Sequence, residues 1–148
     1  MKRKQAEAPG WPKFDAPLLQ EIVAAFQRRR KALRNQAGLS CEREFTETPS
    51  GAFERLNFDL CPSFGDMRLT VWEDGELWLR FCVPAFQRHG GWAFQDDFHG
   101  TTDDISPAAL VALVEATIRE SFYPGRSDPA AHRTRLRTIW QRVRPAQG

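Results

Sequence analysis

Carboxylates and a histidine gather in the stretch FQDDFHGTTDD, where together they could bind a cation. They are Asp96, Asp97, His99, Asp103 and Asp104. Hard divalent cations prefer clustered oxygen ligands, but the order of these residues lacks the D-x-[DN]-x-[DN]-G pattern of a calcium loop. Acidic residues directly before a helix are also favoured by the helix dipole alone. We therefore expect a solvated acidic loop, with neither a metal ion nor another cofactor.

The chain has three cysteines, Cys41, Cys61 and Cys82, whose number and wide spacing match neither a zinc site nor a disulfide framework. A Cys–His nucleophile pair would combine Cys82 with His89 or His99. No catalytic motif surrounds these residues, and Cys82 lies in the strand-like run LRFCVPAF, where a packed thiol is the usual state. The sequence contains no G-x-S-x-G, P-loop or Rossmann fingerprint. We therefore expect no catalytic residues, and the free cysteines favour the reducing cytoplasm.

Charge is segregated along the 148 residues, although the net charge is only +2. Residues 1–36 carry nine basic and three acidic side chains, and residues 126–148 carry six and one. The centre, residues 37–125, carries six basic and fifteen acidic side chains. The chain therefore has basic ends and an acidic centre. This distribution of charge restricts the possible partners more than the small net charge does.

Two basic stretches could hold the phosphates of a nucleic acid: Arg28–Lys31 with Arg34, and the arginine-rich segment Arg133–Arg144. Nucleic-acid-binding proteins gather Lys and Arg on one face, often beside aromatic residues. Arginines on helices are also commonly a solvated face, and here they could neutralise the acidic centre of the same molecule. A nucleic-acid-binding module is therefore the alternative function.

The stretch RLTVWEDGELWLRF (Arg68–Phe81) is typical of a β-hairpin and would position several residues suited to binding. A two-residue turn at Asp74-Gly75 would mix aliphatic and charged residues on both faces. A three-residue turn, with Gly75 left-handed in a G1 bulge, instead pairs Val71 with Leu77 on an aliphatic face. Because a slip of one residue would exchange the faces, we expect the three-residue turn.

The second face of this hairpin carries arginines and tryptophans. It sets Arg68 across from Arg80, Thr70 across from Trp78, and Trp72 across from Glu76. Either a helix or a terminal segment covers this face as a second small core, or the face recognises a partner, because Trp and Arg often dominate binding energies. Arg68 and Arg80 would repel each other, so we expect an acidic residue beside them, from this chain or another. We expect the face to be at least partly accessible.

Apolar residues at helical spacing indicate three helices around the strands. Their expected boundary residues, in chain order, are Asp15 and Pro17 with Gly38, Ser106 and Pro107 with Pro124-Gly125, and Asp128 with Pro129. In each case a polar residue caps the helix, proline occupies its first turn, and glycine or proline ends the first two.

Period-two patterns indicate strands at Cys41–Thr48, Ala52–Leu60 and within Gly90–Gly100, in addition to the hairpin. The predicted fold class is α+β: an antiparallel meander of about five strands with one N-terminal and two C-terminal helices packed on it. Residues 1–14 are interpreted as a flexible basic arm and residues 15–148 as a single domain. The sequence has neither the apolar region of a secretory signal nor a run of the roughly 18 apolar residues that a membrane span needs, so we expect no membrane partner.

Across residues 50–122, the hairpin with EDGELWLRF, the strand GGWAFQDDFHG and the Ser-Pro-capped helix SPAALVALVEAT resemble the small α+β immunity proteins of bacterial toxin systems. Such proteins are cytosolic inhibitors, so the resemblance implies a cognate protein toxin as the partner. An inhibitor needs only a rigid complementary surface, of about 800 Å² on each partner, and acidic residues would speed its encounter with a basic toxin cleft. The expected partner-binding residues are Arg68, Trp72, Trp78, Arg80, Trp92, Asp96, Asp97, Asp103 and Asp104.

Overall fold

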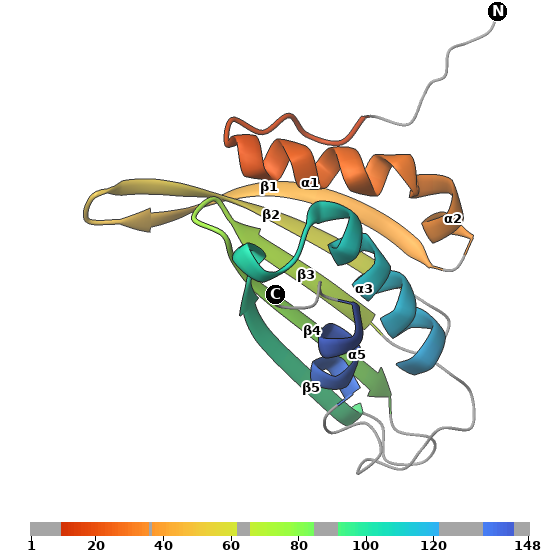
Figure 1. Cartoon of the computed structure of the whole chain (residues 1–148). Coiled ribbons are helices and arrows are strands. Elements are labelled where there is room, and N and C mark those ends of the chain that lie inside the picture. The colour runs from red at the N-terminus through yellow and green to blue at the C-terminus, as the bar shows by residue number, and fades with distance from the viewer. Residues whose placement is uncertain (1–9, 36, 62–65, 85–91, 122–134, 144–148) are drawn as a thin grey trace, which may run out of the picture.

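In the computed structural model, five strands form one antiparallel sheet in which the spatial order of the strands follows the sequence (Figure 1). The structure describes residues 10–35, 37–61, 66–84, 92–121 and 135–143. The strands are β1 (Gly38–Thr48), β2 (Gly51–Cys61), β3 (Asp66–Trp72), β4 (Glu76–Pro84) and β5 (Trp92–Thr101). The helices are α1 (Pro17–Arg28) and α2 (Arg30–Arg34) before the sheet, and α3 (Pro107–Ser121) and α5 (Arg135–Val143) after it. A short 3-10 turn, η2 (Thr102–Asp104), joins β5 to α3. The predicted α+β meander is confirmed.

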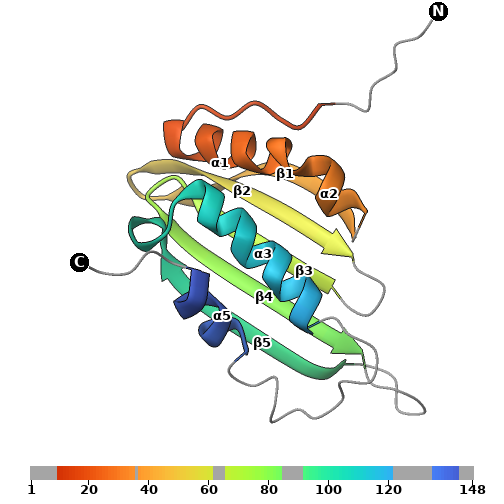
Figure 2. The same ribbon diagram turned by 45° about the vertical axis from the view of Figure 1, so that its right-hand side comes forward.

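The described helices α1, α3 and α5 lie on the same face of the sheet, with α3 between the other two (Figures 1 and 2). Beneath them, Leu69, Leu79 and Phe81 are completely buried together with Phe26 of α1 and Leu110 of α3. The aliphatic face of the hairpin is therefore the core face, as predicted. In the described part of the chain no helix covers the opposite face (Figures 1 and 2).

The β3–β4 hairpin has the predicted register, with Val71 opposite Leu77 and Arg68 opposite Arg80. Gly75 has a φ of 98°, in the left-handed region, and its N–H donates to the carbonyl of Trp72 at 2.9 Å. The three-residue turn is therefore confirmed. The physical reason is that only this register separates the aliphatic residues from the charged ones.

The start of α3 also follows its local signal. The helix begins at Pro107, and the hydroxyl of Ser106 accepts a hydrogen bond from the N–H of Ala109 at 3.1 Å. In α5, Ile139 and Trp140 are buried. The expected start of that helix at Asp128-Pro129 lies outside the described residues.

The boundaries of the first helix differ from the prediction. Asp15 does not cap it: the capping residue is Ala16, and the Asp15 carboxylate instead bonds Arg43 of β1 at 2.9 Å. The N–H groups of Asp15 and Ala16 donate to the buried carboxylate of Glu54 on β2, a distant acceptor that no local pattern reveals. Gly38 does not end the helix either, because it is already the first residue of β1.

Part of the segment interpreted as a flexible arm is packed. Phe14 is buried, and the ring of Trp11 meets Phe58 of β2 edge to face at 5.3 Å between centroids. Residues 1–9 lie outside the described part. Among the described helices, none combines the length and the apolar character needed to cross a lipid bilayer.

Candidate functional site on the uncovered sheet face

The face of the sheet opposite the helices, called here the uncovered face, is formed by alternate residues of all five strands. Its charged and aromatic members follow from the strand register: Glu42, Glu44, Phe53, Arg55, Asp59, Asp66, Arg68, Trp72, Glu76, Trp78, Arg80, Asp97 and His99. Six of these residues are carboxylates and three are arginines. The face therefore carries net negative charge around an arginine- and tryptophan-rich centre.

At the centre of the uncovered face is a hollow of about 140 Å³. Its lining residues are Arg55, Asn57, Arg68, Thr70, Trp72, Trp78 and Arg80. Asn57 and Thr70 are buried at the base of the surrounding longer side chains, with only 1% and 5% of their surface exposed. The Thr70 hydroxyl donates to Asn57 Oδ1 at 2.6 Å, and Asn57 Nδ2 donates to Glu44 at 2.8 Å. Because these buried polar groups are satisfied, they form a fixed base for the hollow.

The two arginines that face each other across β3 and β4 each have an acidic partner on the next strand. Arg68 donates from Nε and Nη2 to the two carboxylate oxygens of Asp59, at 2.7 and 3.0 Å. Arg80 Nε donates to Asp97 at 3.0 Å. The expected acidic residues are thus present, and both come from this chain. The hydrogen bond to Asp59 is the largest influence on Arg68 and raises its pKa. Desolvation acts in the opposite direction, but the charges of nearby carboxylates add to the increase.

The β1 side of the hollow is held in the same way. Arg55 donates from Nε to Glu44 at 3.0 Å, and its Nη1 and the indole N–H of Trp72 both donate to the hydroxyl of Thr46, at 3.1 and 3.3 Å. The hydrogen bond from Arg55 is the largest influence on Glu44 and lowers the pKa of this carboxyl, with Asn57 contributing in the same direction. These contacts orient the arginine and tryptophan side chains before any partner arrives.

Trp78 is held in place by ring contacts. It stacks on His99 at 5.2 Å between centroids with an interplanar angle of 15°, and the Arg80 guanidinium lies 4.2 Å from its ring centre. Its indole Nε1 is buried and finds no acceptor among the described residues. A buried donor without an acceptor costs free energy that an added acceptor would recover.

The structure brings together five of the nine sequence-predicted partner-binding residues: Arg68, Trp72, Trp78, Arg80 and Asp97. For Trp92 and Asp96 only the backbone is described. In the ladder Trp92 pairs with Pro84, and Asp96 pairs with Phe81, a residue of the core face. In the strand register, Asp96 therefore aligns with residues of the core face, whereas Asp97 aligns with residues of the uncovered face.

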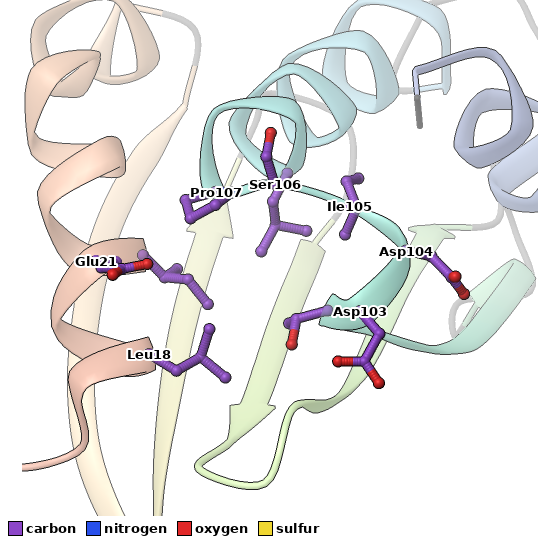
Figure 3. A pocket seen from close by; sticks show the side chains of 10 residues that line it. Leu18, Glu21, Asp103, Asp104, Ile105, Ser106 and Pro107 are labelled. Atoms are coloured by element: carbon purple, nitrogen blue, oxygen red, sulfur yellow. The ribbon is translucent and has the colours of Figure 1, made fainter. Parts of the chain in front are cut away.

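Asp103 and Asp104 lie away from the uncovered face, on η2. They line a separate pocket of about 390 Å³ between α1, η2 and the start of α3, on the helix side of the sheet (Figure 3). Figure 3 shows Leu18 and Glu21 of α1 across this pocket from the η2 turn. The chain leaves the sheet after β5. Asp103 and Asp104 on η2 therefore lie on the helix side, although Asp97 of β5 is only six residues before Asp103 and lies on the uncovered face.

The residues of the uncovered face that sequence reasoning missed include Arg55, Asn57, Asp59 and His99. The signal for three of them was available. The same alternation that directs Leu56, Phe58 and Leu60 into the core places the residues between them on the other face. His99 becomes part of the face because β5 pairs with β4 in a register that sets it opposite Trp78.

The geometry does not assemble a nucleophile from the described cysteine and histidine. Cys82 pairs with Gln95 and Trp78 pairs with His99, so Cys82 and His99 are four residues, or about 13 Å, apart along the strands. Burial raises the pKa of the Cys82 thiol and raises that of Cys41 to about 12. His89 lies outside the described residues. Within the described ranges no three His, Cys, Asp or Glu side chains are grouped to hold a metal ion.

The basic residues of α1 and α2 are partly engaged within the protein. Arg29 forms a two-point ion pair with Glu115 of α3, with N–O distances of 2.8 and 3.1 Å. The Arg30 guanidinium lies 4.8 Å from the centre of the Trp11 ring. α3 lies between α1 and α5, which carries the described part of the second basic stretch (Figure 2).

The sequence matches no protein-family model and no curated protein, and the fold matches no solved structure. The functional argument therefore depends on the geometry of this chain. The feature that supports a function best is the uncovered face. Hydrogen bonds and ring contacts orient the arginines and tryptophans of its central hollow, and carboxylates lie around them.

Proposed function

We propose that the protein is an immunity-type binding protein of the bacterial cytoplasm, which inhibits a protein toxin by docking its uncovered face against it. The observation that carries the proposal is the hollow at the centre of that face: Trp78 lines it, and the buried indole N–H of this residue has no acceptor among the described residues. A partner that places a carbonyl or carboxylate oxygen in the hollow would supply the missing acceptor. The resemblance of residues 50–122 to immunity proteins supports a toxin as this partner.

The side chains around the hollow suit a protein interface. Trp and Arg are enriched among the residues that dominate binding energies, because they desolvate a large area for little loss of conformational freedom. Here their freedom is already reduced, since Arg68 is bound to Asp59 and Trp78 is stacked on His99. Little further ordering is needed on binding, which favours affinity.

The charge of the face selects the kind of partner. Six carboxylates surround the three arginines, each of which already has a carboxylate partner in this chain. Net negative charge attracts a basic surface and accelerates its association at low salt. A basic toxin cleft with an acceptor group at its centre is therefore the complementary partner.

The test is capture of the partner from the native cell lysate on the tagged full-length protein, with and without nuclease, followed by affinity measurement with two variants. Trp78→Ala removes the aromatic wall of the hollow and should weaken the complex by more than ~1 kcal/mol. Arg34→Ala, on α2 on the helix side, is the matched control and should leave the affinity unchanged. Circular dichroism and thermal unfolding establish that both variants remain folded.

Equal binding by Trp78→Ala and the unchanged protein would show that the uncovered face is not the docking surface. Loss of every captured partner after nuclease, together with weaker binding by Arg34→Ala, would instead favour the nucleic-acid alternative on the basic helices. In that case the affinity should also fall steeply with salt, because phosphate binding releases counterions.

A further inference from the structure

β1 is an edge strand, because it pairs with β2 alone. It is 11 residues long, and among the described residues no backbone hydrogen bond reaches its outer edge. Such an edge offers a row of unpaired N–H and C=O groups to another strand. The β1–β2 hairpin also projects beyond the N-terminal end of α1 (Figure 1), so its outer part carries no helix.

The backbone groups that point out of this edge can be identified from the neighbouring strands. The carbonyl of Glu54 on β2 accepts a hydrogen bond from the N–H of Glu73 at 3.0 Å, so the backbone of Glu54 is directed towards β3. Glu54 is opposite Phe45 in the β1–β2 ladder. Residues of a non-hydrogen-bonded antiparallel pair direct their backbone groups away from each other. The N–H and C=O of Phe45 therefore face outward, and alternation gives the same direction to Arg43 and Glu47.

The side chain of Phe45 is unusually exposed for this molecule. With 51% of its surface accessible, it is the one exposed large hydrophobic residue in the described part of the chain. Arg43, Phe45 and Glu47 lie on one face of β1, and the Arg43 guanidinium is 4.7 Å from the centre of the Phe45 ring. An unpaired edge thus carries an aromatic side chain between Arg43, which is also paired with Asp15 and Glu54, and the exposed Glu47.

We propose that β1 pairs with β1 of a second copy of this chain, antiparallel, about a twofold axis at Phe45. In this register Phe45 lies against Phe45 of the partner subunit, and Arg43 lies against Glu47 of the partner subunit, twice by symmetry. An axis at Glu44 would set two glutamates opposite each other, and an axis at Arg43 would set two arginines opposite each other. Like charges directly opposite are destabilising, whereas aromatic and opposite-charge pairs stabilise a sheet.

The result is a continuous ten-stranded sheet, with the helices of both copies on one side and both uncovered faces on the other. The projecting part of each hairpin lies along β1 of the other copy, and the bare hairpin is what allows this close approach. This pairing uses the edge of the sheet, so it is independent of the proposed toxin-binding function.

The first experiment is sedimentation equilibrium of the full chain over a wide concentration series, with Phe45→Pro and Phe45→Thr. Proline removes the outward N–H, which the β1–β2 ladder does not use, so the monomer should fold. It should raise the dimer dissociation constant at least about tenfold, because both hydrogen bonds of the central pair are lost. Phe45→Thr keeps the N–H and should have a smaller effect. A monomer at every concentration, or a dimer unaffected by Phe45→Pro, would overturn the proposal.

A second pair of variants tests the register without altering the backbone. Glu47→Arg places an arginine against Arg43 of the partner subunit and should weaken the dimer several-fold. Glu42→Arg makes the same change of charge on the same strand, but its side chain faces Thr48 of the partner subunit, so the dissociation constant should change by less than about twofold. Equal effects of the two variants would rule out the Phe45 axis.

Amide hydrogen exchange locates the interface directly. As concentration rises, exchange should slow at the amides of Phe45 and Glu47, which point outward. Exchange at Glu44 and Thr46 should stay constant, because their amides already bond β2 in the monomer. Slowing confined to the helices or to another strand would place any dimer interface elsewhere and contradict the proposal.

Discussion

Glu54 is the side chain that ties the N-terminal segment to the sheet. It is only 3% exposed, and it accepts hydrogen bonds from the N–H groups of Asp15 and Ala16 and from Arg43. Burial, the largest single influence, raises the pKa of Glu54, but the two amides and the guanidinium together outweigh it and the net pKa is lowered. The charged form is therefore the one that stabilises the fold. This contact spans 39 positions between Asp15 and Glu54, which is why the sequence suggested an ordinary helix cap at Asp15 instead.

Because the pKa of Glu54 is lowered in the folded protein, the free energy of unfolding should decrease at acidic pH. Because the folded-state pKa of Glu54 lies below the ordinary glutamate value of 4.5, the stabilisation by this carboxylate is complete above about pH 4.5. It is lost as pH falls through the folded-state pKa. We expect the free energy of unfolding to fall below pH 4.5, and to fall less steeply in Glu54→Gln, as measured by urea unfolding across the pH range.

At neutral pH, Glu54→Gln should destabilise the protein by about 2–3 kcal/mol, because Arg43 and two backbone amides lose a charged acceptor. Glu21→Gln is the control: its side chain is exposed on α1, away from both proposed interfaces, and the change should cost less than about 0.5 kcal/mol. Identical pH profiles for the unchanged protein and Glu54→Gln would show that this carboxylate does not govern acid stability.

At the level of the elements, the hairpins follow from alternation and turn chemistry, as the β3–β4 turn demonstrates. Gly75 closes this turn with its φ of 98°, and its carbonyl accepts the N–H of Thr102 at 2.8 Å, so the turn also positions η2. The glycine was predictable from the hairpin register. Its contact with η2 was not, because that contact depends on how β5 returns towards the helices.

Gly75→Ala should destabilise the protein by about 1–2 kcal/mol, because a non-glycine residue is strained in the left-handed region. The added Cβ would also lie 2.9 Å from the Thr102 hydroxyl. Gly38→Ala is the matched control, since its backbone is extended and its nearest neighbour would be 3.8 Å away. Thermal unfolding of the two variants should show a clear drop in Tm for Gly75→Ala alone, and equal changes would contradict the strain argument.

At the scale of the whole molecule, one hydrophobic core joins the helices to the sheet. Buried residues of α1, α3 and α5 pack against the same face of the strands, and rings meet across the layers, as between Phe98 of β5 and Trp140 of α5 at 4.6 Å. Charge separates across these layers: the uncovered face is acidic, whereas most arginines of α1 and α2 lie on the helix side. A shared core implies that the layers are stable only together.

We therefore expect the sheet, the helices packed on it and the packed residues Trp11 and Phe14 to unfold as one cooperative unit. Denaturant transitions followed by tryptophan fluorescence and by far-ultraviolet circular dichroism should coincide, because helices and sheet lose their packing together. Tryptophans lie on both faces, with Trp140 beneath the helices and Trp78 on the uncovered face. Two separated transitions would show that the helix layer or the β1–β2 hairpin forms an independent unit.

The sequence alone determined the strands, the β3–β4 register and the Ser106 cap, because each depends on residues within a few positions of one another. It also separated the hairpin into an aliphatic face and an Arg/Trp face, since only one register avoids mixing the two. That the helices cover the aliphatic face (Figure 1) follows from tertiary packing and not from any local pattern. The tertiary structure also decided that Asp59 and Asp97 neutralise the facing arginines, and that Asp103 and Asp104 leave the face that holds Asp97. These outcomes depend on packing between distant segments, where burial and the satisfaction of charges outweigh any local preference.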